Sequence, residues 1–263
     1  MQLFSIFGDP VAHSRSPLMH NAVFKNCNYP ACYTRTHLQD ATKLKERFFS
    51  LGLSGANVTI PHKEAAFAAC DEVRGFAKKV GVVNTIVKED GKLIGYNTDA
   101  DGFMYAIESF KPLKHILVLG AGGTAKALVA RFLEEKIQVS VLNRSASRLA
   151  YFKTLNCECF TWNDFELQKY DLVVNTTSAG LNDTNLPAPS DIIENILQNT
   201  HYAADAIYGK LTPFLECAKE KNITFKNGAD MLLGQGVLAN ALFTNAKLSK
   251  EAIQDAMRKS FSL

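Results

Sequence analysis

The sequence predicts two α/β domains, and three observations carry that prediction. Short apolar, β-branched runs alternate with longer amphipathic stretches along the whole chain, which is typical of α/β domains with mainly parallel sheets. The length of 263 residues allows one large domain or two modest ones at roughly 150 residues per domain. A strand–glycine–helix unit of the dinucleotide-binding kind begins only at His115, and the 114 residues before it are too many for an extension.

In the first domain, strand-like runs are followed by helical patterns. Pro17 stands in the first turn of the first expected helix, and Asp40 can cap the second. The Asp90-Gly91 step between two β-branched runs is a strong hairpin signal. The expected strands cover 3–8, 32–38 and 55–60, and the expected helices cover 16–26, 40 to about 50, and a stretch from Pro61 onward.

The second domain opens on HILVLG, a buried-strand pattern, followed by the helical run AGGTAKALVARFLEE. Later strands are expected at 138–143, 171–178, 202–208 and 223–228, and apolar helices from about Gln235 onward. We place the boundary in a helix at 101–111 before Pro112. The expected organisation is a substrate-binding domain over 1–101 and a Rossmann-type domain over 102–235, with a cleft between them. The helices of about 236–263 are expected to pack back on the first domain.

Composition excludes several classes of protein. Charged residues make up 21% and apolar residues 47% of the chain, and the net charge of +3 is spread along it. We therefore expect no nucleic-acid and no membrane partner. The N-terminus lacks a basic leader, and no run of about 18 apolar residues occurs. The six cysteines form no zinc pattern, so we expect no metal, reduced thiols and a cytoplasmic location.

A glycine motif follows the strand HILVLG directly. Gly120-Ala121-Gly122-Gly123-Thr124-Ala125 has the form G-x-G-x-x-A between a strand and a helix, which is the context that the dinucleotide fingerprint requires. Glycines permit a tight turn, and the helix N-terminus offers free N–H groups to a pyrophosphate. The motif also occurs in ordinary strand–helix turns. The prediction of dinucleotide binding therefore depends on the strand before the motif and the helix after it.

The next strand ends at Asn143-Arg144-Ser145, with Arg148 shortly after. An NAD enzyme usually has a carboxylate there to bind the ribose 2′-hydroxyl. A guanidinium instead forms charge-assisted bonds with a 2′-phosphate. The pattern favours NADP, although both arginines could be solvated charges at a helix start.

Polar clusters stand at four further strand ends or turns of the first domain, where α/β proteins bind ligands. Each cluster alone can be explained by capping or turn formation. The clusters are His13-Ser14-Arg15-Ser16-Pro17, Asn57-Val58-Thr59-Ile60-Pro61-His62-Lys63, Val83-Asn84-Thr85 and Asn97-Thr98-Asp99.

Together with GAGGTAKA, NRS, NTTSAG, DAIYGKLTPFL and GADMLLGQG, these clusters resemble the ordered motifs of the shikimate dehydrogenase family over nearly the whole chain. The resemblance implies reversible, NADP-dependent reduction of 3-dehydroshikimate to shikimate, a step toward aromatic amino acids. A carbonyl that receives a hydride needs a proton donor. Lys63 can donate that proton, with Asp99 as the carboxylate that orients it.

The resemblance also implies the remaining site residues. Ser14, Ser16 and Thr59 would bind the substrate carboxylate, and Asn84, Tyr208 and Gln235 the rest of the substrate. The loop Asn175-Thr176-Thr177, with Gly228 and Met231, would lie near the nicotinamide. The chain departs from the family pattern at Thr176, at Gly209-Lys210 and at Gly236, which leaves fine placement in the cofactor loops open.

Several alternatives stay open at this stage. A quinate/shikimate dehydrogenase with broader substrate or cofactor use fits the same motifs. A non-catalytic NADP-binding regulator would not need the pair of Lys63 and Asp99. A Rossmann-like methyltransferase would typically need an acidic residue where Asn143-Arg144 stands. The sequence does not distinguish a monomer from a homodimer.

Overall fold

The computed structural model describes residues 1–110 and 112–261, so Lys111 and the end of the predicted C-terminal helix at 262–263 lie outside the described residues. The chain forms two compact units. One, here called the N-terminal unit, combines 1–102 with the segment from Leu233 to the C-terminal end; the other, the second unit, is Phe103–Leu232. None of the helices in the described ranges is long and apolar enough to cross a membrane.

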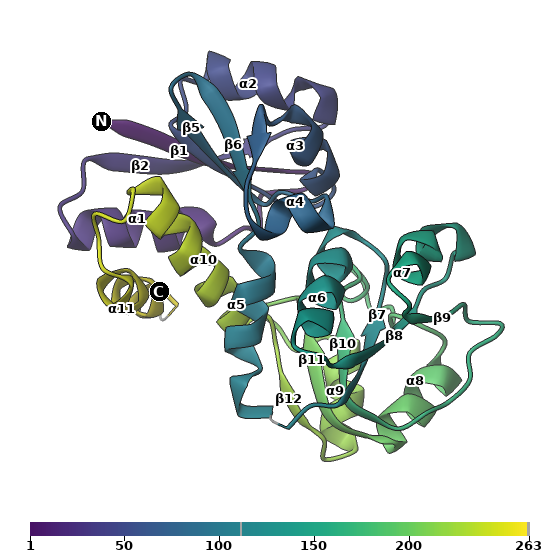
Figure 1. The fold of residues 1–263 in the computed structure, drawn as a ribbon. Helices are drawn as coiled ribbons and strands as arrows, with labels where there is room; N and C mark the ends of the chain where they lie inside the picture. Colours follow the sequence, from purple (N-terminus) through teal and green to yellow (C-terminus); the bar gives the residue numbers. More distant parts are fainter. Residues whose placement is uncertain (111, 262–263) are drawn as a thin grey trace. The chain divides into compact units, whose positions relative to one another are not determined.

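The N-terminal unit is built on a six-stranded sheet in the order β2-β1-β3-β5-β6-β4. Figure 1 labels β1, β2, β5 and β6 of this sheet. Strand β1 pairs in parallel with β2 and β3, while β5 runs antiparallel to β3 and β6. The strands are β1 (Gln2–Gly8), β2 (Ala31–His37), β3 (Gly55–Val58), β4 (Glu72–Val73), β5 (Thr85–Glu89) and β6 (Lys92–Tyr96). The helices are α1 (Ser16–Asn26), α2 (Leu44–Ser50), α3 (Lys63–Ala69), α4 (Phe76–Val80), α11 (Lys250–Ser260), the start of α5 (Asp99–Ala106) and most of α10 (Ala229–Phe243).

Alternating side chains of β1 supply two cores, one on each face of this sheet. Phe7 packs with Leu44 and Phe48 of α2, while Phe4 packs on the other face with Phe24 of α1 and Phe243 of α10. The predicted hairpin is confirmed: β5 and β6 are joined by Asp90 and Gly91, whose φ angles of 48° and 79° suit a type I′ turn.

The second unit has a six-stranded, all-parallel sheet in the order β12-β11-β10-β7-β8-β9. Read from β9, this is the strand order 3-2-1-4-5-6 of dinucleotide-binding proteins. The strands are β7 (His115–Leu119), β8 (Gln138–Leu142), β9 (Glu158–Phe160), β10 (Tyr170–Asn175), β11 (Thr200–Asp205) and β12 (Thr224–Lys226). The helices are α6 (Gly123–Glu134), α7 (Ala150–Thr154), α8 (Ser190–Gln198), α9 (Pro213–Glu220) and the end of α5.

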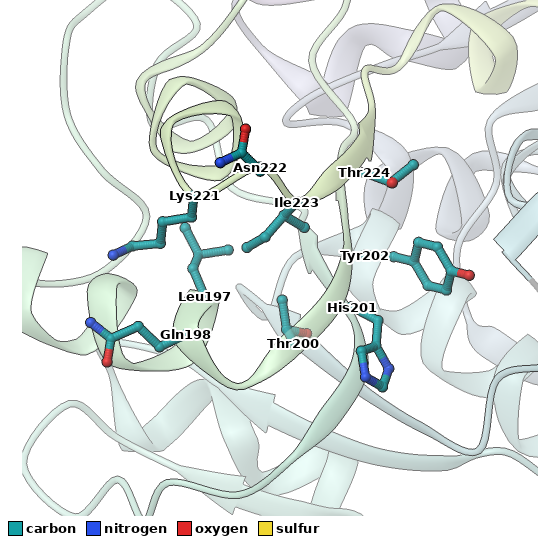
Figure 2. Close-up of a pocket in the computed structure, with 9 residues that line it drawn as sticks. All are labelled: Leu197, Gln198, Thr200, His201, Tyr202, Lys221, Asn222, Ile223 and Thr224. Carbon is teal, nitrogen blue, oxygen red and sulfur yellow. The ribbon is translucent and has the colours of Figure 1, made fainter.

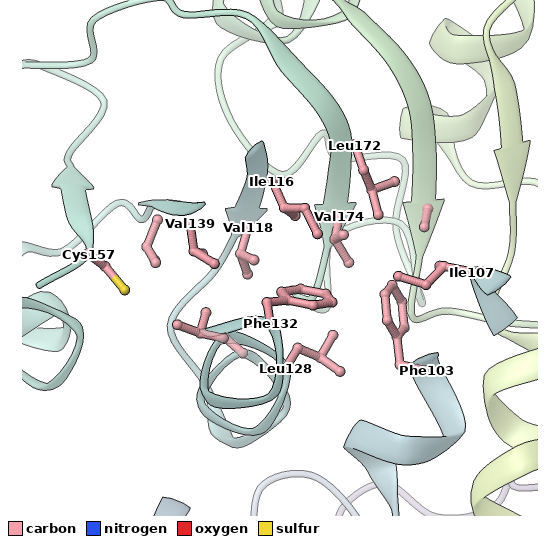
Figure 3. Packing of buried hydrophobic residues seen from close by; sticks show 14 of the residues in the cluster. Phe103, Ile107, Ile116, Val118, Leu128, Phe132, Val139, Cys157, Leu172 and Val174 are labelled. Carbon is pink, nitrogen blue, oxygen red and sulfur yellow. The ribbon is translucent and has the colours of Figure 1, made fainter. Parts of the chain in front are cut away.

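Both faces of this sheet are covered by helices, as a parallel sheet requires. Ile116 and Val118 of β7 point into a core completed by Leu128 and Phe132 of α6 (Figure 3). The intervening residues of β7 face a second core, formed mainly with α8 and α9. The residues of HILVLG are apolar without alternation because both faces of β7 contact a hydrophobic core.

Several elements begin or end at other residues than predicted, among them β11, which spans Thr200–Asp205 and not 202–208. The predicted helix over 101–111 is α5 from Asp99 to Ala106 followed by a 3₁₀ turn at Glu108–Phe110. Helix α10 begins at Ala229, six residues before the expected start, because the Asn227 side chain accepts a hydrogen bond from the Ala229 N–H. The strand expected to run to Ser178 ends at Asn175.

Candidate active site

The catalytic residues predicted from sequence meet at one edge of the N-terminal sheet. Strands β3 and β6 point the same way, since each is antiparallel to β5 between them. Lys63 begins α3 after β3, and Asp99 begins α5 after β6. The Lys63 Nζ donates a hydrogen bond to Asp99 Oδ2, and only 11% and 9% of the two side chains are exposed. The pair is therefore a largely desolvated acid–base couple.

Asn84 holds Asp99 from the other side. Its Nδ2 donates to Asp99 Oδ1 at 2.8 Å, while its Oδ1 accepts from the Thr98 N–H at 2.8 Å and from Thr85 Oγ1 at 3.0 Å. Because both ends of the amide are engaged, Asn84 orients the carboxylate that holds Lys63. Its predicted contact with substrate hydroxyls stays a prediction.

The two predicted serines lie together before and at the start of α1. The Ser14 hydroxyl donates to Ser16 Oγ at 3.2 Å, and both residues are 4% exposed. The Arg35 guanidinium fixes this turn, since its Nε and Nη2 donate to the Ser14 carbonyl at 3.0 and 2.6 Å. Sequence reasoning missed Arg35, because an arginine in an alternating strand gives no signal beyond a solvent-facing residue.

Thr59 and Gln235 are placed by close backbone approaches to glycines. A Cβ on Gly8 would lie 2.4 Å from Thr59 Cγ2, and a Cβ on Gly102 would lie 2.5 Å from the Gln235 backbone nitrogen. Gly102 stands three residues after Asp99 on α5, so Gln235 packs near the same face of that helix.

In the second unit, the predicted glycine loop lies at the point where the strand order reverses, between β7 and β10. Gly120 has a φ of +105°, and a Cβ there would lie 2.9 Å from both Thr176 Oγ1 and Thr177 Cγ2. Gly122 precedes α6 and has open space above its Cα. Only glycine fits the first position, and the second leaves room for a ligand at the helix N-terminus.

The end of β8 carries the predicted phosphate-binding residues. Asn143 Nδ2 donates to the Ser145 carbonyl at 3.0 Å, which closes the turn. Arg144 and Arg148 are exposed, and neither forms an ion pair with any other described residue. Two unpaired guanidinium groups at this strand end fit a 2′-phosphate.

The remaining predicted residues lie at the end of β10, in the loop after β11 and after β12. Asn175 Oδ1 accepts from the Thr177 N–H at 3.0 Å and from Thr177 Oγ1 at 2.8 Å. Gly228 is packed against backbone, because a Cβ there would lie 2.3 Å from the Ala206 carbonyl oxygen. Met231 is 7% exposed and belongs to the core shown in Figure 3. Tyr208 is half-buried in the loop after β11.

A second functional residue that the sequence does not reveal is Asp205, the last residue of β11. It is 1% exposed, and burial raises the pKa of its carboxyl, an effect opposed by hydrogen bonds from Thr212, Ile207 and Asn175. The available signal was a single acidic residue within the otherwise apolar run predicted as a strand over 202–208.

A hollow of about 670 Å³ lies elsewhere in the second unit, between the starts of β11 and β12 and the ends of α8 and α9 (Figure 2). Thr200 and His201 line it, whereas the glycine loop and Asp205 stand at the opposite ends of the strands. This hollow is therefore separate from the candidate cofactor site.

The fold and these residues define a class: an α/β dehydrogenase whose second unit is of the Rossmann type and whose N-terminal unit holds a buried lysine–carboxylate pair. Residues 6–86 match the family model described as the shikimate dehydrogenase substrate binding domain. The chain is 41% identical over 260 residues to the shikimate dehydrogenase (NADP(+)) of Helicobacter hepaticus, covering 98% of this chain and 97% of the relative. The chain belongs to the shikimate dehydrogenase family.

Other relatives agree along the full length. The shikimate dehydrogenase (NADP(+)) of a Geobacillus species is 36% identical over 277 residues, covering 98% of this chain and 99% of the relative. Among solved structures, the Thermus thermophilus shikimate 5-dehydrogenase in complex with NADP(H) and shikimate superposes with a TM-score of 0.85 at 33% identity, covering 99% of this chain and all of that one. A shikimate dehydrogenase from Peptoclostridium difficile superposes with a TM-score of 0.88 at 26% identity, covering all of this chain and 98% of the other.

Proposed function

We propose that the protein is an NADP-dependent oxidoreductase that interconverts 3-dehydroshikimate and shikimate, in the biosynthesis of aromatic amino acids. The N-terminal unit would bind the substrate and the second unit NADP. The buried Lys63–Asp99 pair carries the proposal, because it supplies the proton chemistry of a carbonyl reduction within a chain whose relatives bear this activity in their names.

The second unit fits NADP. Residues of the glycine loop and the N-terminus of α6 would hold the pyrophosphate, since Gly122 leaves open space above the helix start. Arg144 and Arg148 would hold the 2′-phosphate with charge-assisted hydrogen bonds. When bound, the cofactor supplies or accepts the hydride.

Lys63 would donate and accept the proton of the reaction. As an ammonium it donates to the carbonyl oxygen that becomes the hydroxyl, and as an amine it takes the proton back in the reverse direction. The Asp99 carboxylate accepts a hydrogen bond from Lys63 Nζ and so orients it. Asn84 fixes the carboxylate in turn, so the proton donor is held in place before the substrate arrives.

The hydroxyls of Ser14, Ser16 and Thr59 suit the substrate carboxylate, because they donate hydrogen bonds without placing another full charge in a buried site. The Arg35–Ser14 contact makes this serine turn rigid. Asn84, Tyr208 and Gln235 offer donors and acceptors for the other substrate groups.

The location and assembly are further parts of the proposal. All six cysteines are free, which suits the reducing cytoplasm. We propose a monomer or a homodimer, to be determined by sedimentation.

The experiment follows NADPH formation with shikimate and with quinate, each repeated with NAD. The proposal expects a rate with shikimate and NADP that exceeds the other three combinations by about tenfold or more. Comparable rates with quinate or with NAD would instead identify an enzyme of broader specificity. No reaction with shikimate under any condition would contradict the proposed function.

A further inference from the structure

A buried carboxylate that the proposed chemistry does not use stands at the centre of the loops beside the glycine motif. Asp205 ends β11, and its register partner on β10 is Asn175. Within the described residues Asp205 forms no ion pair, although it is almost completely buried. A carboxylate in such a place is retained only where hydrogen bonds satisfy it.

Three donors from three different segments converge on this carboxylate. Thr212 Oγ1 and Asn175 Nδ2 donate to Oδ2 at 2.7 and 3.0 Å, and the Ile207 N–H donates to Oδ1 at 2.9 Å. Thr212 is also the N-cap of α9, where its hydroxyl accepts from the Leu215 N–H. One side chain therefore ties the end of β10, the loop after β11 and the start of α9 together.

Asn175 transmits this constraint to the glycine loop. While its Nδ2 is held by Asp205, its Oδ1 holds the backbone and the hydroxyl of Thr177. Thr177 Cγ2 in turn would lie 2.9 Å from a Cβ on Gly120. The loop after β10 thus reaches the glycine loop with its orientation set by Asp205.

The loop after β11 is held in the same way. The Ala206 N–H donates to the Asn175 carbonyl at 2.9 Å, and the Gly228 N–H donates to the Ile207 carbonyl at 2.9 Å. Because the Ile207 N–H is itself bound to Asp205, the segment leading to Tyr208 is fixed on both sides.

The position of these loops indicates what they serve. A dinucleotide binds across the switch point of such a sheet, with one mononucleotide over each half. Arg144 and Arg148 follow β8 and mark the half that takes the 2′-phosphate of the adenosine. The loops after β10 and β11 belong to the other half, which leaves them the nicotinamide end.

We propose that Asp205 is a positioning residue for the nicotinamide end of the cofactor, because its carboxylate holds the loops 175–180 and 206–212 in one arrangement. This inference rests on the proposed use of NADP. In this role Asp205 acts through Asn175 and Ile207, which donate hydrogen bonds to its carboxylate.

The test is Asp205→Asn. The new NH₂ group must face either the Ile207 N–H or the two donors Thr212 Oγ1 and Asn175 Nδ2, so at least one link is lost in each orientation. Asn175 cannot restore the link by flipping its amide, since its Oδ1 holds the Thr177 N–H. The dissociation constant is measured by isothermal titration calorimetry for NADPH and for the same molecule without its nicotinamide ring.

The proposal expects the dissociation constant of NADPH to rise about tenfold or more, as for the loss of a charge-assisted hydrogen bond, with the ring-less molecule bound as in wild type. Asp171→Asn is the matched control: Asp171 is a carboxylate on β10 that accepts from the Lys114 and His115 N–H groups at the opposite strand end. It should change neither constant. Equal rises for both ligands in Asp205→Asn, or no rise for either, would overturn the proposal.

If Asp205→Asn does not fold, Thr212→Val tests the proposed role of Asp205 instead. It removes one donor and leaves two, so NADPH should bind about threefold more weakly, and Thr212→Ser should restore binding. An unchanged NADPH constant in Thr212→Val would then count against the proposal. The proposed function can fail on its own: wild-type protein would then bind NADPH but not oxidise shikimate. Wild-type protein that binds no NADPH would overturn both the proposed function and the proposed role of Asp205.

Discussion

Replacing Lys63 by methionine removes the proposed proton donor and keeps most of the side-chain volume. General acid–base groups contribute about 10²–10⁴-fold to rate, which is about 3–5 kcal/mol of activation free energy at about 1.4 kcal/mol per tenfold. We therefore expect kcat for shikimate oxidation to fall by that factor. The dissociation constant of shikimate should change far less, because Ser14, Ser16 and Thr59 are expected to bind its carboxylate.

The same substitution leaves Asp99 buried without its cation. Breaking a buried ion pair costs about 3–5 kcal/mol of folding free energy, and the remaining bond from Asn84 Nδ2 offsets part of that cost. The double variant Lys63→Met/Asp99→Asn removes the unpaired charge of Asp99. Its free energy of unfolding in urea should therefore be higher than that of Lys63→Met, while its kcat should stay as low. Stopped-flow and steady-state assays measure kcat, and calorimetry measures shikimate binding. A kcat within about threefold of wild type in a folded Lys63→Met protein would refute the assignment.

Three further predictions follow from the second unit and from a buried histidine. Arg144→Ala should raise the KM for NADPH by about tenfold or more and leave the KM for shikimate nearly unchanged; equal rises would refute the 2′-phosphate assignment. Gly228→Ala would place a Cβ 2.3 Å from the Ala206 carbonyl oxygen, so a loss of about 1–3 kcal/mol in urea unfolding is expected, and unchanged stability would contradict the packing. Burial lowers the pKa of His20 from 6.5 to about 3, so the unfolded chain binds a proton that the native chain does not as the pH falls below 6.5. Stability should then drop by up to about 2 kcal/mol between pH 6.5 and 5, and His20→Phe should remove that part of the slope; an identical slope in the variant would contradict it.

The sequence allowed the two α/β units and their motifs to be predicted because strong local signals mark them. HILVLG, the glycine loop and the Asp90-Gly91 turn each depend on a few neighbouring residues. Lys63 and Asp99 could be paired from the sequence through the resemblance and through the chemistry of a lysine and a carboxylate.

What could not be predicted depends on contacts between distant segments. The burial of Asp205 follows from the register of β10 against β11, which no local pattern fixes. The two-residue strand β4 at Glu72–Val73 is too short for a periodic pattern. His20 lies on α1, and its ring stacks on the ring of Tyr33 with the two ring centroids 4.4 Å apart. A histidine in a predicted helix does not by itself indicate that its ring is buried.

The most direct test of the proposed function runs the reaction in the direction of reduction. Purified protein is mixed with NADPH and 3-dehydroshikimate, NADPH loss is followed by absorbance, and the product is identified by mass spectrometry and chromatography against authentic shikimate. We expect one shikimate formed for each NADPH consumed, with almost no reaction in Lys63→Met. A folded wild-type protein that binds NADPH but yields no shikimate would contradict the proposal.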